Sequence, residues 1–364
     1  MKQGIAVGRP IRAGEIRVHL IWFDSLGAKS SCILVETPDV KVLIDPGVAE
    51  MQPSYPLPDD EKFRLMDEAF TAIKAASAYA DLVVITHYHY DHHTLPSEAP
   101  GLYHGKLLLV KNPNIWINDS QWGRARLFFE ELCEYLCGGD QSEIYEDPRE
   151  VEEVDPIEWI PRAASRDFGD YQGRRMELFE RGRRWLRKLR KKWGTGRWVK
   201  ELEAGDIKVR FADGRDFRIG STRIRFTKPM FHGIEYDRLG WVIGLVVEYG
   251  GRKILYSSDI QGPAIEDYAD WIIGESPDAV VLDGPPTYLF GFTLNRINLR
   301  RSIENVLRIL HECGAKPIIY DHHNLRDRHY RRRLGEVYED SEAAGRLMSA
   351  AEWLGMKPLI DTLT

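Results

Sequence analysis

The residues best suited to chemistry lie together in the stretch Thr86-His87-Tyr88-His89-Tyr90-Asp91-His92-His93. This stretch directly follows the apolar run Leu82-Val83-Val84-Ile85. A short β-branched run that gives way to polar residues predicts a buried strand. Ligands of open α/β sheets usually bind at the carboxyl ends of the strands. The stretch therefore predicts a binding site just past the end of a strand.

The spacing of these residues indicates a metal site. His87 and His89 are two positions apart, so in extended backbone their side chains point to the same side. Asp91 and His92 come from the turn that follows. Imidazole and carboxylate suit zinc, manganese or iron, and no nearby cysteine indicates a thiolate site. The alternative is a solvent-exposed, His-rich turn without metal, which four candidate ligands at this spacing after a buried strand disfavour.

The stretch resembles the H-x-H-x-D-H motif of the metallo-β-lactamase superfamily. In that family the motif binds two metals between two β-sheets flanked by helices, together with a later His, a bridging Asp and a last His. Residues at predicted strand ends stand in that order here. The resemblance implies one metal bound by His87, His89 and His232. It implies a second metal bound by Asp91, His92 and a late histidine, with Asp259 bridging the two.

Two neighbouring residues, His322 and His323, are candidates for the late histidine. His322 is favoured as the first histidine past its strand, but the sequence leaves both open. The Leu43-Ile44-Asp45-Pro46-Gly47 stretch looks like the first motif of the superfamily, in which the Asp orients a metal-bound histidine. The resemblance thus gives a set of metal ligands and one supporting carboxylate.

The same resemblance implies a fold and a reaction. The expected fold class is α/β, an αββα four-layer sandwich that spans residues 1–364, with a charged helical insertion at 132–202. Two divalent ions, zinc first and manganese or iron as alternatives, would activate a bridging hydroxide. That hydroxide would attack phosphorus or a carbonyl carbon, with Asp91 or Asp259 orienting it and taking its proton.

Two ligand positions differ from those of other branches of the superfamily, which disfavours two kinds of reaction. Asp259 stands where common β-lactamases carry a cysteine ligand, and His89 stands where flavodiiron oxidoreductases carry Glu. The chain is most similar to an uncharacterised archaeal family of predicted metal-dependent hydrolases. That likeness is carried by Asp24-Ser25-Leu26-Gly27, Leu43–Gly47, His87–His92, Ser258–Pro263, Gly284–Tyr288 and Asp321-His322-His323. It implies hydrolysis without naming a substrate.

Strands and helices alternate around these motifs. Apolar alternation and turn residues predict strands before the metal motif and again after residue 215. They are Ile16–Phe23, Cys32–Glu36, Lys41–Ile44, Asp216–Ile219, Thr222–Thr227, Trp241–Glu248, Arg252–Tyr256, Ala279–Leu282 and Pro317–Tyr320. Helical spacing predicts Asp59–Ala80, capped by Asp59 or Asp60 with Phe63 and Phe70 on its buried face, and Gln121–Cys137, Leu299–Cys313 and Asp340–Leu354.

The predicted insertion has an unusual charge pattern. Glu130–Glu158 holds twelve acidic residues and one basic residue, whereas Arg174–Lys200 holds twelve basic and two acidic ones. Trp185, Leu186, Leu189 and Trp193 fall on one helical stripe of the basic block. The favoured interpretation is structural, with neutralising blocks and an aromatic stripe packed on the body. The alternative is an arm that holds a phosphate polymer.

Composition sets the remaining expectations. The chain has 364 residues, 43% hydrophobic and 29% charged, with a net charge of −6, which is typical of a soluble globular protein and gives no global reason to expect nucleic acid. Four cysteines without a C-x-x-C pair, and no signal peptide or membrane span, predict a cytoplasmic location. The oligomeric state is not predicted.

Three functions follow from these observations. The first is hydrolysis of a phosphodiester, in a small molecule or a nucleic acid. The second is hydrolysis of an ester or lactone on the same fold. The third is a metal-stabilised nucleic-acid-binding protein without turnover, which would use the basic block.

Overall fold

Two β-sheets form the centre of the molecule in the computed structural model, which describes residues 8–138 and 144–363. The first sheet has the strand order β1-β2-β3-β4-β5-β6-β10-β9 and the second β11-β12-β15-β16-β17-β18-β19. The first contains β1 (Ile11–Ala13), β2 (Ile16–Phe23), β3 (Ser31–Glu36), β4 (Lys41–Ile44), β5 (Leu82–Ile85), β6 (Leu107–Val110), β9 (Leu202–Ala204) and β10 (Ile207–Phe211). The second contains β11 (Asp216–Ile219), β12 (Thr222–Phe226), β15 (Leu245–Tyr249), β16 (Arg252–Tyr256), β17 (Ala279–Asp283), β18 (Ile318–Asp321) and β19 (Leu347–Met348).

Both faces of the central strands are buried. In β3, Ile33 and Val35 belong to a hydrophobic cluster shared by the two sheets, whereas Cys32 and Leu34 belong to the cluster under the helices. The same alternation occurs in β17, where Val281 joins the inter-sheet cluster. Successive side chains of a strand point to opposite faces. Burial on both faces therefore requires a layer on each side of each sheet.

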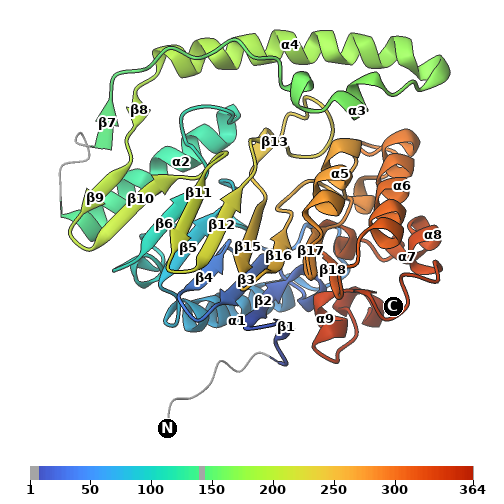
Figure 1. The fold of residues 1–364 in the computed structure, drawn as a ribbon, viewed down its shortest axis with the longest axis horizontal. Helices are drawn as coiled ribbons and strands as arrows, with labels where there is room; N and C mark the ends of the chain where they lie inside the picture. The colour runs from blue at the N-terminus through green and yellow to red at the C-terminus, as the bar shows by residue number, and fades with distance from the viewer. Residues whose placement is uncertain (1–7, 139–143, 364) are drawn as a thin grey trace.

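Helices supply the two outer layers. On the first sheet these are α1 (Asp59–Ser77) and α2 (Asp119–Leu132), whose Ile73 and Phe128 pack in the outer cluster. On the second sheet these are α5 (Glu266–Glu275) and α6 (Arg296–Glu312). Figure 1 shows α5 and α6 beside the second sheet. The predicted αββα sandwich is confirmed.

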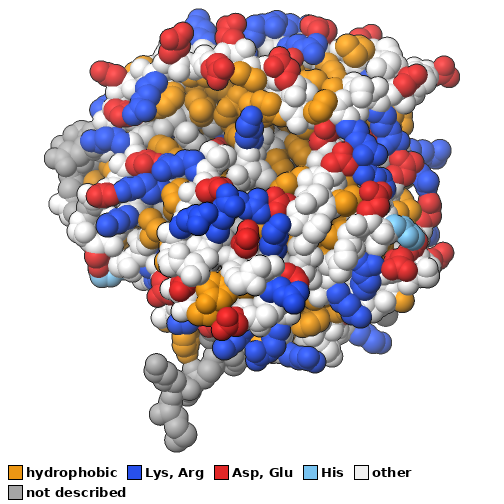
Figure 2. Space-filling view, in the orientation of Figure 1, with side chains coloured by type: hydrophobic (Ala, Val, Ile, Leu, Met, Phe, Trp, Pro, Cys, Tyr) orange, Lys and Arg blue, Asp and Glu red, His pale blue; other side chains and the backbone are white. Residues whose placement is uncertain are grey.

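The segment predicted to be an insertion lies across one edge of this sandwich (Figure 1). Its main element is α4 (Gln172–Thr195), preceded by β7 (Tyr145–Glu146) and α3 (Pro161–Ser165) and followed by β8 (Trp198–Val199). Figure 1 shows α4 crossing the top of the molecule. Figure 2 shows hydrophobic side chains gathered below that edge, among mixed charges. The predicted aromatic stripe of α4 is buried against the body, as the structural interpretation expected.

The insertion packs on a short loop that follows β13 (Met230–Phe231) and ends at β14 (Trp241–Val242). Trp185 of α4 stacks on Trp241, with ring centroids 5.3 Å apart and an interplanar angle of 3°. Gly182 lies so close to Tyr236 that a Cβ there would lie 2.2 Å from the ring. Close packing of α4 on this loop therefore depends on the missing side chain of Gly182.

Two helix predictions were wrong in detail. Asp340–Leu354 is not one helix, because its centre forms β19 and a helix, α9 (Ala350–Trp353), begins only at the capping box of Ser349 and Glu352. Helix α1 has Pro58 at its N-cap without a side-chain bond. Its buried face runs through Leu65, Ala69, Ile73 and Ala76, while Phe63 is exposed.

The remaining elements are short. They include α7 (Tyr330–Arg333) and α8 (Gly335–Tyr338), which follow the late histidines. Within the described residues, every helix is too short or too polar to cross a lipid bilayer.

Candidate metal centre

The histidine loop is held by the turn that follows β4. Asp45 accepts hydrogen bonds from the amide of Thr86 at 2.8 Å and from its hydroxyl at 2.6 Å. A Cβ on Gly47 would lie 2.2 Å from the amide nitrogen of His93, so only glycine leaves room for the loop backbone. The Asp-Pro-Gly turn therefore both anchors the loop and makes space for it.

A first group of ligands converges from three segments: His87, His89, His232 and Asp259. The Nε2 of His87 lies 3.2 Å from Nδ1 of His89, and the Nε2 of His232 lies 3.4 Å from Oδ2 of Asp259. Two donor atoms at about 2.0–2.1 Å from one tetrahedral zinc ion lie roughly 3.3 Å apart. The spacing of these atoms is therefore that of ligands around one metal ion.

A second group contains Asp91, His92 and His322. The Nε2 atoms of His92 and His322 are 3.2 Å apart, and Nε2 of His322 lies 3.8 Å from Oδ2 of Asp91. Asp259 joins this group as well, because its Oδ2 lies 3.3 Å from Nε2 of His322. One carboxylate thus contacts both groups.

Unsatisfied nitrogen atoms support a metal at the first group. His232 is buried, yet neither of its ring nitrogens has a hydrogen-bond partner. Such a group is costly in a protein interior unless another partner satisfies it. A metal ion on Nε2 would do so, and neutral imidazole with carboxylate is a donor set that zinc, manganese and iron accept.

Charge states in the first group suit metal binding. Burial lowers the pKa values of His87 and His89 well below the usual range, so both are neutral. Burial alone would raise the pKa of Asp259, but the charges of His92 and His322 hold it well below its usual range. Metal ligands must be deprotonated. These three groups are already in that form. In the second group, burial alone would lower the pKa of His92, but the charges of Asp259 and Asp45 raise it to about 10.

Each histidine of the second group donates to a carboxylate behind it. His92 donates from Nδ1 to Asp45 at 2.8 Å, and His322 donates from Nδ1 to Asp24 at 3.0 Å. Such bonds fix the ring orientation and leave Nε2 for the metal. The role expected for Asp45 is thus found. Sequence analysis noted the motif that contains Asp24 but did not predict that Asp24 orients His322. Nothing in the sequence indicates that these two residues meet.

His323 takes a different position from His322. It donates from Nδ1 to Asp283 at 2.8 Å, and its Nε2 lies 3.8 Å from Oδ2 of Asp259. His322 has a φ of 79°, a conformation that non-glycine residues rarely adopt. This strained link turns two consecutive histidines towards one centre. His322 belongs to the second group, whereas His323 forms a further set of possible ligands with Asp259 and His322.

The centre reaches solvent at the tip of the histidine loop. Tyr90 is 41% exposed there, while His89 and Asp91 are partly exposed. The guanidinium of Arg124 lies 4.8 Å from the centre of the Tyr90 ring. Arg326, buried behind the loop, pairs with Asp24 and lies 3.1 Å from Oδ2 of Asp91. Sequence reasoning missed both arginines, since neither lies in a ligand motif.

The other histidines take no part in the centre. His93 lies next to the loop and contacts the carbonyl oxygen of His89 from Nδ1, at 2.9 Å. His19 and His311 pair with Glu36 and Asp340 elsewhere.

The chain is similar to known proteins over the histidine loop and over nearly its whole length. The family profile described as the metallo-beta-lactamase superfamily matches residues 27–93. A UPF0282 protein of Methanopyrus kandleri is 35% identical over 351 residues, which cover 93% of this chain and 94% of that protein. The chain belongs to the UPF0282 family.

Further UPF0282 proteins show similar coverage. One from Korarchaeum cryptofilum is 32% identical, covering 94% of this chain and 91% of its own. Among solved structures, a possible metal-dependent hydrolase from Veillonella parvula aligns at 11% identity and a TM-score of 0.41, over 89% of this chain and 94% of that one. This UPF0282 chain is a metal-dependent hydrolase by its superfamily and by the side chains that converge in its centre.

Proposed function

We propose that the protein hydrolyses phosphodiesters with two divalent metal ions, zinc first and manganese or iron as alternatives. The observation that carries this proposal is the position of Asp259. Its Oδ2 lies 3.4 Å from Nε2 of His232 in the first group and 3.3 Å from Nε2 of His322 in the second. Contact of one carboxylate with both groups supports a role for Asp259 in holding both ions.

The residues of the chain divide the work. The two groups would hold the two ions, which would supply Lewis acidity and a water molecule of lowered pKa. Asp91 is partly exposed, as His89 is, and its carboxylate would orient that water and accept its proton. Arg326 fixes the position of Asp91 from behind. His323 presents Nε2 towards Asp259, and we assign it to hydrogen-bond the substrate.

Cations near the opening favour an anionic substrate. Arg124 has no carboxylate partner among the described residues and lies over Tyr90 at the rim. Lys29 is partly buried near Asp91, and burial, with the charge of Arg326, lowers its pKa. Positive charges beside an opening raise the local concentration of anions. A neutral ester or lactone would gain nothing from them, which is why the phosphodiester is preferred.

The test compares two activated substrates on metal-loaded protein. We expect the rate enhancement over the uncatalysed reaction to be larger for bis(4-nitrophenyl) phosphate than for 4-nitrophenyl acetate. Asp259→Asn should lower the diester rate by about a hundredfold or more. His311→Gln is the matched control, because His311 is exposed and pairs only with Asp340. A larger enhancement for the ester, or a diester rate that Asp259→Asn leaves unchanged, would overturn the proposal.

A further inference from the structure

From residue 181 to its end at Thr195, the cations of α4 fall into two sets. One set is engaged: Arg183 pairs with Asp155, Lys192 pairs with Asp119, and Arg190 donates to the carbonyl oxygen of Val154. The side chains of the other set are exposed, and none of them forms an ion pair or a hydrogen bond with a described residue. We call this set the unpaired stripe: Arg181, Arg184, Arg187, Lys188 and Lys191.

The stripe occupies one face of the helix. Its members recur at three to four residues, opposite the buried face that contains Phe179, Leu186 and Trp193. From residue 181 to the end of α4 at Thr195 no Asp or Glu occurs. At about 1.5 Å per residue, the stripe is roughly 15 Å long. It presents positive charge to solvent along a line and not at a point.

The unpaired stripe destabilises α4 when no partner is bound. Like charges three or four positions apart on a helix destabilise it. The chain as a whole carries a net charge of −6, so the stripe does not follow from a basic composition. In the neighbouring acidic block, Asp155 pairs with Arg183, which is not a member of the stripe. A linear anionic partner would offset this repulsion.

The stripe continues onto the loop that carries His232. Arg181, Arg184 and Lys188 line a hollow of about 240 Å³ together with Trp185 and Arg238. The guanidinium of Arg238 lies 4.8 Å from the centre of the Trp185 ring. Arg238 stands six positions after His232 in the same loop. The stripe and the metal centre are therefore joined by one short segment.

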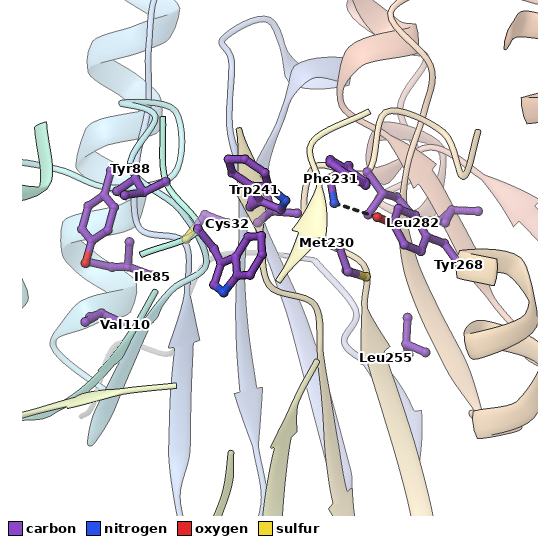
Figure 3. Close-up of a cluster of buried hydrophobic side chains, with 14 of the residues drawn as sticks. Cys32, Ile85, Tyr88, Val110, Met230, Phe231, Trp241, Leu255, Tyr268 and Leu282 are labelled. Carbon is purple, nitrogen blue, oxygen red and sulfur yellow. Dashed lines mark hydrogen bonds between the residues drawn. The ribbon is translucent and has the colours of Figure 1, made fainter. Parts of the chain in front are cut away.

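Hydrogen bonds tie that segment to the histidine loop. Asn118 at the N-cap of α2 donates to the carbonyl oxygen of Arg238 at 2.8 Å. Gln121 donates to the carbonyl oxygen of Leu239 at 2.7 Å and accepts from the amide of Tyr88 at 3.2 Å. Figure 3 shows Trp241, at the end of this segment, among the buried side chains that also include Tyr88. The cationic surface is thus fixed relative to the centre.

We infer that the unpaired stripe and Arg238 bind the phosphate backbone of a nucleic acid and hold it beside the metal centre. This inference rests on the proposed phosphodiesterase function and names its substrate class. A membrane surface fits less well. An interfacial helix inserts its apolar face into lipid, whereas the apolar face of α4 is buried against the body.

The experiment measures binding without cleavage. A fluorescent 20-nucleotide RNA with 2′-O-methyl and phosphorothioate groups is titrated with metal-loaded protein at several salt concentrations. The test variant is Arg181→Gln/Arg184→Gln/Lys188→Gln. The control variant is Arg12→Gln/Lys316→Gln/Lys357→Gln, which removes three exposed cations without ion pairs among the described residues.

We expect the wild-type affinity to fall steeply with salt. In the test variant the slope of log affinity against log salt should decrease by about 2, at about 0.7 per lost phosphate contact, and affinity should fall at least tenfold. The control variant should match the wild type. An unchanged slope in the test variant, no salt-dependent binding by the wild type, or tighter stripe-dependent binding to anionic vesicles than to RNA would overturn the inference.

Hydrolysis of bis(4-nitrophenyl) phosphate by the wild type is measured in parallel. It reports on the metal centre alone, because this small diester is too short to span the stripe. Stripe-dependent RNA binding without diester hydrolysis would contradict the proposed phosphodiesterase function. Diester hydrolysis without stripe-dependent RNA binding would contradict only the inference that the stripe binds nucleic acid.

Discussion

The carboxylate of Asp24 accepts a hydrogen bond from Nδ1 of His322 at 3.0 Å, although 298 positions separate the two residues. Asp24 follows the end of β2 and His322 follows the end of β18, one in each sheet. The centre therefore exists only when both sheets have assembled. Metal binding and folding should be coupled in this protein.

The first prediction concerns Asp24. Asp24→Asn removes the charged acceptor that orients His322, so the affinity for the second metal ion should fall about 10–100-fold. Calorimetric titration of chelator-treated protein with zinc measures both affinities. Asp60→Asn, at an exposed residue of α1, is the control and should bind zinc as the wild type does. Equal zinc affinities in Asp24→Asn and the wild type would show that Asp24 does not support metal binding by His322.

The second prediction concerns metal content. Protein reconstituted with excess zinc should hold close to two ions per chain by elemental analysis. His89→Ala should lose mainly one ion, because His89 belongs to the first group only, whereas Asp259→Ala should weaken both. Chelation should lower the Tm, since metal binds the native chain far better than the unfolded one. One ion in the wild type, or a Tm that chelation leaves unchanged, would contradict it.

The third prediction separates the two late histidines. His322→Gln should lose an ion, because Nε2 of His322 lies 3.2 Å from Nε2 of His92. His323→Gln should keep both ions and lower kcat on the phosphodiester, because His323 is held by Asp283 at the border of the centre. Metal content and kcat are measured on the same samples. Loss of metal in His323→Gln with full metal in His322→Gln would reverse the assignment.

Much of the fold could be predicted because local patterns determine it. The apolar, β-branched run Leu82–Ile85 was predicted to be a buried strand, and it forms β5. The prediction that His87 and His89 point to the same side followed from the geometry of extended backbone. The prediction of the last helix was wrong because a tertiary contact outweighed a local pattern. Helical spacing in Asp340–Leu354 was present, but parallel pairing of Leu347 and Met348 with β18 outweighed it.

The supporting contacts of the centre could not be predicted in the same way. Asp283 and Asp24 face histidines only because strands far apart in sequence end at the same edge. The division of the α4 cations has the same origin, since Arg183 and Lys192 meet carboxylates at positions 155 and 119. Sequence gives the charge of such residues, whereas the packed structure decides which of them are neutralised.

The fourth prediction concerns a buried ion network that fastens α4 to the loop of His232. The side chain of Glu235 in that loop is only 4% exposed, and it accepts hydrogen bonds from Arg175 of α4 at 2.8 Å and from Arg301 of α6 at 2.8 and 3.0 Å. Burial alone would raise the pKa of Glu235, but the charges of Arg301 and Arg175 outweigh it and lower the pKa. Glu235 is therefore ionised in the folded protein.

The sign of the pH dependence follows from that shift. A carboxyl group whose pKa is lower in the folded chain stabilises it above its unfolded pKa, about 4.3. That stability is lost as the pH falls through the folded pKa. Glu235→Gln should therefore lower the free energy of unfolding at pH 7 by about 3–5 kcal/mol, because Arg175 keeps no counterion. The difference from wild type should shrink as the pH falls below about 4.

Urea denaturation at pH 7 and at pH 3.5 measures the free energy of unfolding of Glu235→Gln and of the wild type at each pH. Glu304→Gln is the control, since Glu304 is 34% exposed where it pairs with Arg166, and such a pair contributes about 0–1 kcal/mol. A loss at pH 7 as small as that of the control would mean that the network does not hold α4 in place. A loss of equal size at both pH values would mean that cavity or packing defects, and not the charge of Glu235, produce the effect.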